Sequence, residues 1–380
     1  MCDRLKIRAS VLHEISLKRP YTTFNALSVE EVDLDQPKET EVLVRVVGAG
    51  ICHSDLAAIR GVRKVPLPIV LGHECSGVVE EVGKNVQTVK SGDHVVMTYV
   101  PSCGKCEFCA RGLPSLCDFG RASNREGQLL AGGTRFHAEG RRMFHHLGVS
   151  AFAEHTVVSE LSVIPVPRAI PLEKVALFGC AVLTGIGSVI NRGDVKAGRS
   201  VAVFGCGGVG LNVIQGARLV GASQVIAVDV ASSKLALAKK FGATDTIDAS
   251  SEDPIDSIKE MTDGRGVDYA FEASGNTEVM NQAFMSTRKG GDTILIGITS
   301  PEDRLNIPSS VLVDEQRQLK GSFMGSVIPR RDIPRLIDLY MKGLIKLDDL
   351  ITRYISLDEI NDGFEALASG EAARQIIRMS

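Results

Sequence analysis

Four cysteines lie within seventeen residues, in the segment PSCGKCEFCARGLPSLC at positions 101–117. Cys103, Cys106 and Cys109 are spaced three residues apart, and Cys117 follows eight residues later. Four thiolates at such spacings can close a tetrahedral shell around Zn²⁺, and an all-cysteine shell leaves no open position for a substrate. The segment therefore predicts a structural zinc site that stabilises a lobe too small for a core of its own.

Other interpretations of these cysteines are weaker. An iron–sulfur cluster fits the first three, but Cys117 lies too far along the chain for the ferredoxin pattern. Disulfides are disfavoured because the chain has nine cysteines, an odd number, and begins without a secretory signal. We therefore expect a cytoplasmic protein with reduced thiols. Unligated thiols are the plainest remaining alternative.

A glycine-rich turn marks a second chemical site. Gly205, Gly207 and Gly210 form the pattern G-x-G-x-x-G between an expected strand and an expected helix. The glycines allow a tight turn, close approach to a pyrophosphate and helix packing on the strand, and the helix N-terminus attracts phosphates. Asp229 ends the next expected strand and would bind ribose hydroxyls, with no Arg following it to accept a 2′-phosphate. The pattern predicts NAD rather than NADP, and a turn without a ligand is the alternative.

The elements that must position these residues differ along the chain. Before residue 170 the sequence shows short β-branched runs between turn signals, as at 41–52 and 151–158. Residues 173–191 resemble one buried helix. Strand and helix patterns then alternate, which predicts a parallel sheet covered by helices.

Composition excludes several classes of protein. The 380 residues are 44% hydrophobic and 23% charged, which is typical of a soluble globular protein of about two domains. The formal net charge of −3 and the lack of an aromatic-basic stripe argue against nucleic acid as a partner. No apolar run of 18 residues indicates a membrane span.

The order of several motifs resembles that of the zinc-dependent medium-chain alcohol dehydrogenases over nearly the whole chain. These motifs are GICHSD, GHECSGVVEEVG, GDHVV, CGKCEFCARG, GTRFHAEG, FAEHTVV, GCAVLTGIG and VFGCGGVGL. The chain is most similar to the long-loop type, which includes liver-type and glutathione-dependent formaldehyde dehydrogenases. The resemblance implies an α/β protein with a β-rich, chaperonin-10-like catalytic domain at 1–181 and 324–380. A Rossmann domain with a doubly wound parallel sheet would span 182–323, and the chain would form a homodimer.

By this resemblance, Cys52, His73 and Cys180 bind a catalytic zinc with one open position, although their spacing alone would not unite them. Such a zinc lowers the pKa of an alcohol and holds the alkoxide while hydride passes to the nicotinamide. The implied reaction is the reversible, NAD-dependent oxidation of primary alcohols to aldehydes, with two zinc ions per chain.

Supporting residues follow from the same resemblance. Asp55 and Glu74 are expected behind the ligands, with Asp55 orienting His73, and Ser54 is expected to take the alcohol proton. Position 57 is Ala, where some relatives have a His that ends the proton relay, so ribose hydroxyls or another group must do so. The residues assigned to the cofactor besides the glycines and Asp229 are His53, Thr184, Gly208, Val209, Lys234, Ile298 and Arg374.

The substrate is the least determined part of the prediction. Tyr99 and Ile298 are expected to line the pocket, whereas His145 and His146 are adjacent in an extended segment and should face opposite sides. Arg121 matches the formaldehyde-oxidising relatives, which bind a glutathione adduct. The basic residues at 60, 63 and 64 replace the acidic residues of those relatives, however, so we expect free alcohols. The alternatives are S-hydroxymethylglutathione oxidation, an NAD-binding redox sensor without turnover, and a nucleic-acid-binding zinc ribbon.

Overall fold

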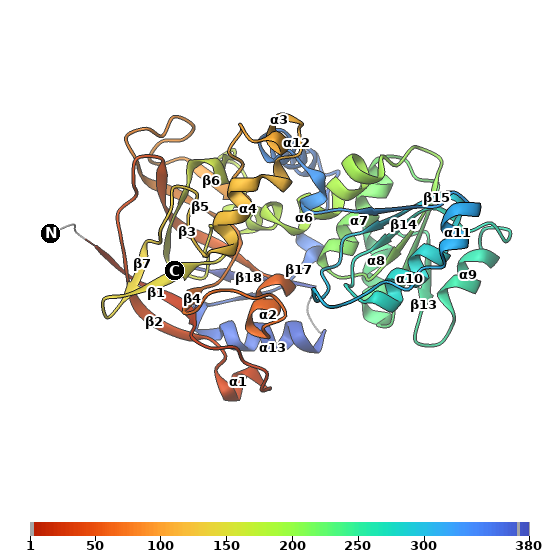
Figure 1. Ribbon diagram of the computed structural model, residues 1–380, viewed down its shortest axis with the longest axis horizontal. Coiled ribbons are helices and arrows are strands. Elements are labelled where there is room, and N and C mark those ends of the chain that lie inside the picture. The colour runs from red at the N-terminus through yellow and green to blue at the C-terminus, as the bar shows by residue number, and fades with distance from the viewer. Residues whose placement is uncertain (1–3, 371–372, 380) are drawn as a thin grey trace. The chain divides into compact units, whose positions relative to one another are not determined.

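The computed structural model describes residues 4–370 and 373–379, which divide into two compact units (Figure 1). The first unit comprises Met1–Cys180, Ile328–Met341 and Leu347–Ser380, and the second comprises Ala181–Val327 and Lys342–Lys346. Ala181 and residues 324–327 and 342–346 thus belong to the second unit, whereas the sequence analysis expected them in the first. The reason is local packing: Gly325 lies against the backbone of Leu183, and the Lys346 N–H donates to Gln215 Oε1 at 2.9 Å.

The first unit is built mainly from β-strands. Its strands are β1 (Leu5–Leu12), β2 (Ser28–Leu34), β3 (Glu41–Ile51), β4 (Ile69–Val70), β5 (Glu74–Val82), β6 (His94–Met97), β7 (Phe136–Ala138), β8 (Arg141–His145), β9 (His155–Ser159), β10 (Val163–Pro165), β17 (Ile351–Ile355) and β18 (Arg374–Arg378). A closed barrel has the order β1-β2-β7-β8-β4, and a second sheet has the order β10-β6-β5-β3-β18-β17, with β9 also paired to β3. β-branched side chains on these strands fill the barrel core, including Val11, Val32 and Val70.

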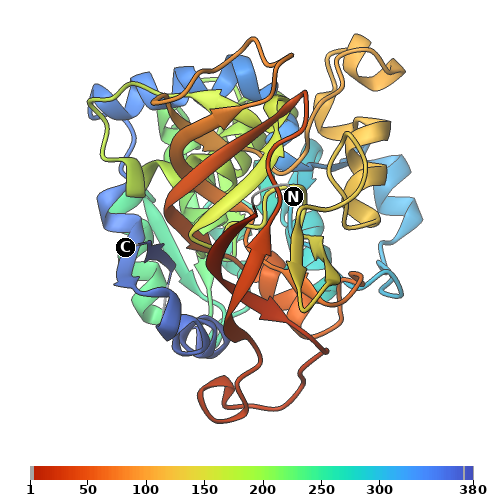
Figure 2. The same cartoon turned by 90° about the vertical axis from the view of Figure 1, so that its left-hand side faces the viewer.

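Short helices connect these strands. They are α1 (Tyr21–Phe24), α2 (His53–Ile59), α3 (Glu107–Ala110), α4 (Asp118–Arg125), α5 (Leu172–Val175), α12 (Pro329–Met341) and α13 (Ile360–Ser369), with one-turn helices at Pro114–Leu116, Glu160–Ser162, Ala176–Gly179, Asp348–Leu350 and Leu357–Glu359. The segment with α3 and α4 forms a lobe beside the strands of the first unit (Figure 2, upper right). This lobe carries the four clustered cysteines.

The second unit is a parallel sheet with helices against both faces (Figure 1). Its strands are β11 (Ser200–Phe204), β12 (Gln224–Asp229), β13 (Asp245–Asp248), β14 (Val267–Glu272), β15 (Thr287–Leu295) and β16 (Gln318–Gly321). Its helices are α6 (Ala181–Gly187), α7 (Gly208–Leu219), α8 (Ser232–Phe241), α9 (Pro254–Glu260), α10 (Thr277–Met285) and α11 (Ser309–Asp314), with one further helical stretch at Ser188–Gly193 and a one-turn helix at Met324–Ser326. The order β13-β12-β11-β14-β15-β16 is that of a dinucleotide-binding Rossmann sheet, which binds its ligand where the strand order reverses beside β11.

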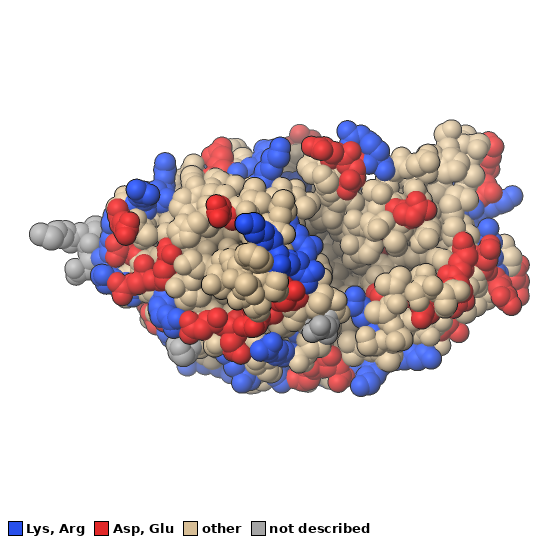
Figure 3. Space-filling view, turned by 90° about the horizontal axis from the view of Figure 1, so that it is seen from below, with Lys and Arg blue, Asp and Glu red and all other residues tan. Residues whose placement is uncertain are grey.

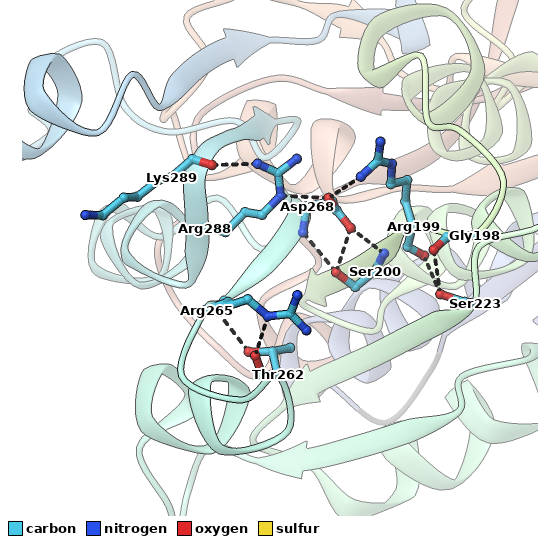
Figure 4. A network of polar contacts seen from close by, with 10 residues as sticks. Gly198, Arg199, Ser200, Ser223, Thr262, Arg265, Asp268, Arg288 and Lys289 are labelled. Carbon is cyan, nitrogen blue, oxygen red and sulfur yellow. Dashed lines mark hydrogen bonds and ion pairs between the residues drawn. The ribbon is translucent and has the colours of Figure 1, made fainter.

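An ionic clamp joins the starts of strands in this sheet. Asp268 on β14 accepts hydrogen bonds from the Ser200 N–H at 2.9 Å and from Ser200 Oγ at 3.0 Å, and Ser200 is the first residue of β11 (Figure 4). Its carboxylate also contacts Arg288 Nε at 2.7 Å and Arg199 Nη1 at 3.3 Å (Figure 4). Burial raises the pKa of Asp268, but these donors outweigh it and lower the pKa below its ordinary value. The clamp lies at the amino ends of the strands, so its role is structural.

Residues 173–191 do not form the single buried helix that the sequence indicates. Helical structure stops at Cys180, whose φ of −144° and ψ of −72° are not helical. None of the described helices is by itself long and apolar enough to cross a membrane, although the bent pair Leu172–Gly179 and Ala181–Gly193 reaches that length and composition. Acidic and basic side chains are mixed over the face seen in Figure 3, without an extended field of one sign.

Candidate active site

Cys52, His73 and Cys180 converge in the first unit. One ligand-capable atom from each, together with a carboxylate oxygen of Glu74, lies within 4.8 Å of all the others, and all four residues are buried. Their meeting follows from the strands. β3 and β5 pair antiparallel with Gly50 opposite Glu74, so Cys52 after the end of β3 lies beside His73 before the start of β5.

Cys180 reaches this pair because its preceding turn packs closely on the same sheet. A Cβ at Gly179 would lie 2.5 Å from the Met97 carbonyl oxygen on β6, so only glycine allows this approach. The Cys180 thiol lowers the pKa of Cys52 well below its ordinary value by hydrogen bonding, and the positive charge of Arg374 adds to the effect. Ser54 Oγ lies 3.9 Å from Cys52 Sγ.

His73 is oriented from behind by Asp55. Its Nδ1 lies 3.1 Å from Asp55 Oδ1, which also accepts the Gly72 N–H at 3.1 Å. Burial alone would lower the pKa of His73, but the charges of Asp55 and Cys52 raise it to about 10. The pKa of Asp55 is lowered to about 2, because the charge of His73 outweighs the burial that would raise it.

These residues fit a zinc ion. The buried Nε2 of His73 has no hydrogen-bond partner among the described residues, and it lies with two sulfurs in one cluster. Donors in a tetrahedral Zn²⁺ shell lie about 3.3–3.8 Å apart, within the observed limit of 4.8 Å. A cation there would displace the proton of His73 and that of Cys180, as metal binding at such ligands requires.

Glu74 and Arg374 form a buried ion pair next to the thiols. Arg374 Nη1 lies 3.2 Å from Glu74 Oε1, and the two side chains are 4% and 0% exposed. The same nitrogen donates to the Ile51 carbonyl oxygen at 3.2 Å. Burial raises the pKa of Glu74 to about 8, against the lowering effect of Arg374. The sequence placed Glu74 behind the ligands, whereas the structure sets its carboxylate among the ligand-capable atoms.

The four clustered cysteines also lie together. One sulfur from each is within 4.8 Å of the others, and Cys106 Sγ lies 3.9 Å from Cys117 Sγ, near the about 3.8 Å edge of a tetrahedral zinc–thiolate shell. Backbone N–H groups point at these sulfurs: Cys103 donates to Cys117 at 3.3 Å, and Gly120 donates to Cys117 at 3.4 Å. Hydrogen bonding to the backbone near Cys109 lowers the pKa of Cys106 to about 6. This donor set fits a closed zinc site.

The glycine-rich turn of the second unit leads from β11 into α7. Gly205 has a φ of +89°, and a Cβ at Gly210 would overlap the Gly205 carbonyl oxygen. A Cβ at Gly207, by contrast, would meet nothing within 4 Å, so the backbone at the start of α7 is open to a phosphate group. Asp229 accepts the Ala231 N–H at 3.0 Å. These features fit a dinucleotide.

The other residues assigned to the cofactor are placed as follows. In the second unit, Thr184 lies on α6 and is buried, Gly208 and Val209 begin α7, Lys234 lies half-buried on α8, and Ile298 lies after β15 and is 52% exposed. In the first unit, His53 is exposed at the start of α2. Arg374 begins β18 and is buried beside Glu74, next to the Cys52, His73 and Cys180 group.

Two aromatic side chains complete the surroundings of His73. The Tyr99 ring stands edge-on to it, with centroids 5.3 Å apart. Tyr99 is one of the two residues that the sequence analysis expected to line the substrate pocket. His146, which the sequence analysis gave no role, lies with its ring centroid 5.7 Å from that of His73. His145 faces a different partner, since its Nε2 accepts the Arg135 N–H at 3.1 Å. No local signal in the sequence distinguishes His146 from a core histidine.

Comparison with known proteins places this geometry in context. Residues 38–168 match the family described as "Alcohol dehydrogenase GroES-like domain", and residues 208–342 match the family described as "Zinc-binding dehydrogenase". S-(hydroxymethyl)glutathione dehydrogenase of Saccharomyces cerevisiae is 40% identical over 366 residues, which cover 94% of each chain. The enzyme of the same name from Escherichia coli O1:K1 is 41% identical over 355 residues, covering 93% of this chain and 96% of that one.

Solved structures agree in fold. An alcohol dehydrogenase zinc-binding domain protein from Burkholderia ambifaria superposes with a TM-score of 0.93 at 36% identity, over 100% of both chains. Benzyl alcohol dehydrogenase from Acinetobacter calcoaceticus superposes with a TM-score of 0.92 at 33% identity, over 99% of this chain and 100% of that one. A zinc-binding dehydrogenase from Sinorhizobium meliloti bound to NADP gives 0.80 at 27% identity, over 98% and 99%.

Proposed function

We propose that this chain, which belongs to the zinc-dependent medium-chain alcohol dehydrogenase family, oxidises free primary alcohols to aldehydes with NAD. The observation that carries the proposal is the buried convergence of Cys52, His73 and Cys180, with His73 Nε2 unpartnered among the described residues. Two thiolates and one imidazole are the donor set of a catalytic zinc that keeps one position for substrate.

Each residue around the proposed zinc site would have a separate role in alcohol oxidation. A zinc ion held by the three ligands would act as a Lewis acid that favours loss of the alcohol proton. Ser54, whose hydroxyl lies 3.9 Å from Cys52 Sγ, would accept that proton and pass it outward. Asp55 holds His73 in the tautomer that presents Nε2. Arg374 places a positive charge next to Glu74 and the ligand thiolates.

The second unit would hold the cofactor. The open backbone at Gly207 would receive the pyrophosphate at the start of α7, and Asp229 would accept hydrogen bonds from the ribose. A carboxylate at that position repels a 2′-phosphate, which supports NAD over NADP. The four cysteines of the lobe would hold a second, structural zinc ion.

A second candidate substrate is S-hydroxymethylglutathione. The names of the relatives at 40–41% identity favour it, as does Arg121, which lies exposed on α4. Against it stand the basic residues after α2. Arg60 Nε donates to the Tyr21 hydroxyl at 3.0 Å. Burial lowers the pKa of His146 beside the zinc ligands, and the charge of Arg63 adds a smaller lowering effect. These cations would repel the ammonium group of glutathione.

The test compares kcat/KM for NADH formation from benzyl alcohol, hexanol and S-hydroxymethylglutathione. We expect the highest value with a free alcohol. If the glutathione adduct is preferred tenfold or more, about 1.4 kcal/mol, then the second candidate is right. A protein that holds zinc and NAD but forms no NADH with any of them would be the redox sensor.

The assembly and location are proposed on separate grounds. β16 is an edge strand whose Leu319 is 37% exposed, and Val313 on α11, the helix that precedes it in the chain, is 70% exposed. We therefore expect a homodimer joined at this edge. The cysteines of the described residues are all free thiols, as is usual in the cytoplasm.

A further inference from the structure

His146 is held rigidly next to the metal-binding histidine. It follows β8, which pairs with β4 so that His145 lies opposite Val70. The chain therefore leaves both strands at the same end, and His146 comes close to Gly72 and His73. The His146 N–H donates to Ser150 Oγ at 2.8 Å, and Ser150 Oγ donates to the Val70 carbonyl oxygen at 2.8 Å. These two hydrogen bonds hold the backbone of His146 in place, so its side chain can restrict the position of a neighbouring group.

The imidazole of His146 meets the same carboxylate oxygen that orients His73. Its Nδ1 lies 3.1 Å from Asp55 Oδ1, equal to the distance from His73 Nδ1 to that atom. Gly72 donates to this oxygen as well. His146 Nδ1 is within hydrogen-bond distance of this oxygen, but its orientation is not that of a hydrogen bond, and it has no hydrogen-bond partner among the described residues. Its effect on Asp55 is therefore that of a polar ring packed against the carboxylate.

The position of His146 matters because Asp55 is a fully buried carboxylate. Its side chain is 0% exposed and those of His73 and His146 are 1% exposed. Bulk water therefore does not reach the carboxylate to stabilise its charge. Buried carboxylates need donors around them. His146 supplies one more dipole to Asp55 and, through its ring, restricts where the carboxylate can move.

We propose that His146 is a positioning residue for His73, acting through Asp55. It keeps Oδ1 of Asp55 in line with His73 Nδ1, and this holds His73 Nε2 toward Cys52 and Cys180. The inference rests on the proposed zinc-binding role of His73, but it does not depend on which alcohol is oxidised. The expected consequence is slower zinc loss from the site than Asp55 alone would allow.

The experiment replaces His146 in the full-length zinc-loaded protein and measures zinc release to excess EDTA, together with kcat and KM. His146→Phe keeps a ring but removes the polar nitrogen that faces Asp55, and His146→Asn places an amide nitrogen where Nδ1 was. His146→Gln reaches instead to the place of Nε2. The Cys52→Ser variant identifies which phase of release belongs to this site. His155→Asn is the control, because His155 pairs with Glu80 at 3.1 Å, away from Asp55.

We expect His146→Phe and His146→Gln to release this zinc about 10- to 100-fold faster, the usual effect of losing a residue that supports a ligand. His146→Asn should stay within about threefold of the wild type, and His155→Asn should match it. Equal release from His146→Phe and the wild type overturns the inference, as does equal loss in His146→Asn and His146→Phe. If the wild type and Cys52→Ser release the same zinc with the same phases, then no zinc is bound at Cys52. That result overturns the proposed function as well.

Discussion

Asp229 Oδ2 accepts the backbone N–H of Cys206 at 2.7 Å, so the carboxylate at the end of β12 is fastened to the glycine-rich turn before α7. The residue expected to select the cofactor therefore also holds the loop that would receive its phosphates. One substitution at this position acts on both.

We expect Asp229→Gly to lower the ratio of kcat/KM for NAD to that for NADP by about 10- to 100-fold, the value of one or two charge-assisted hydrogen bonds. Steady-state kinetics with both cofactors measures the ratio. Asp229→Asn is the matched control for the loop, since its amide oxygen can still accept the Cys206 N–H. Equal kcat/KM for NAD and NADP in the unmodified protein would contradict the assignment to ribose.

The two proposed zinc sites predict different losses. Cys106→Ser should lower the zinc content from two ions per chain to about one and reduce the melting temperature, because the closed site stabilises its lobe. Cys52→Ser should also lose one ion and leave the fold largely intact, while kcat falls about a thousandfold or more. Metal analysis, circular dichroism and NADH formation give the three readouts. A wild type with one zinc, or with iron in the four-cysteine site, disproves the two-site assignment.

His145 predicts a loss of stability in acid. Burial and the charge of Arg135 lower its pKa to about 3, whereas the unfolded chain has a His pKa near 6.5. Below about pH 6.5 the unfolded state binds a proton that the folded state does not, so stability falls as the pH falls toward 3. The loss at pH 5 is about 2 kcal/mol relative to pH 8.

His145→Gln should flatten this dependence, because Gln does not titrate and its Oε1 can accept the Arg135 N–H in place of Nε2. Urea unfolding of both proteins at pH 5 and pH 8 measures the difference. His13→Gln is the control, since His13 has a side chain that is 49% exposed. An equal slope in His145→Gln and the wild type would show that other groups cause the acid sensitivity.

The proposed homodimer predicts that charge at the β16 edge dissociates it. Leu319→Lys combined with Val313→Glu places two charges on the exposed apolar edge, and we expect a monomer by light scattering. Leu344→Lys is the control, because Leu344 is 54% exposed outside this edge. A tetrameric wild type would count against the assignment of the interface.

Local patterns and tertiary pairings were not equally accessible from the sequence. The glycine-rich turn, Asp229 and the four cysteines are each defined within one short segment, so their types and spacing carry the interpretation. Cys52, His73 and Cys180 were united only by resemblance to a family. Their contact depends on the register of β3 with β5 and on the close approach at Gly179. Neither can be inferred from the distances between these residues along the chain.

The same limit explains what was missed. The break at Cys180 lies inside an apolar run whose composition suits a continuous helix, and only packing interrupts it. His146 lies beside Asp55 because β8 pairs with β4, and the paired residues Val70 and His145 are 75 positions apart in the chain. Lys346 joins the second unit through Gln215, a contact that no local pattern could indicate.

The pairing of β18 with β3 has a consequence for how the chain is made. Gln375 lies opposite Ile51 in this sheet. The sheet of the first unit is therefore incomplete until β18 has been synthesised, more than three hundred residues after β3. At about 5–20 residues per second, a ribosome takes on the order of tens of seconds to cover that interval. During this time the end of β3 next to Cys52 has a bare edge, and Glu74 has no guanidinium beside it. Zinc delivered to the nascent chain would therefore meet its thiols and its histidine before the counter-charge of Arg374 arrives.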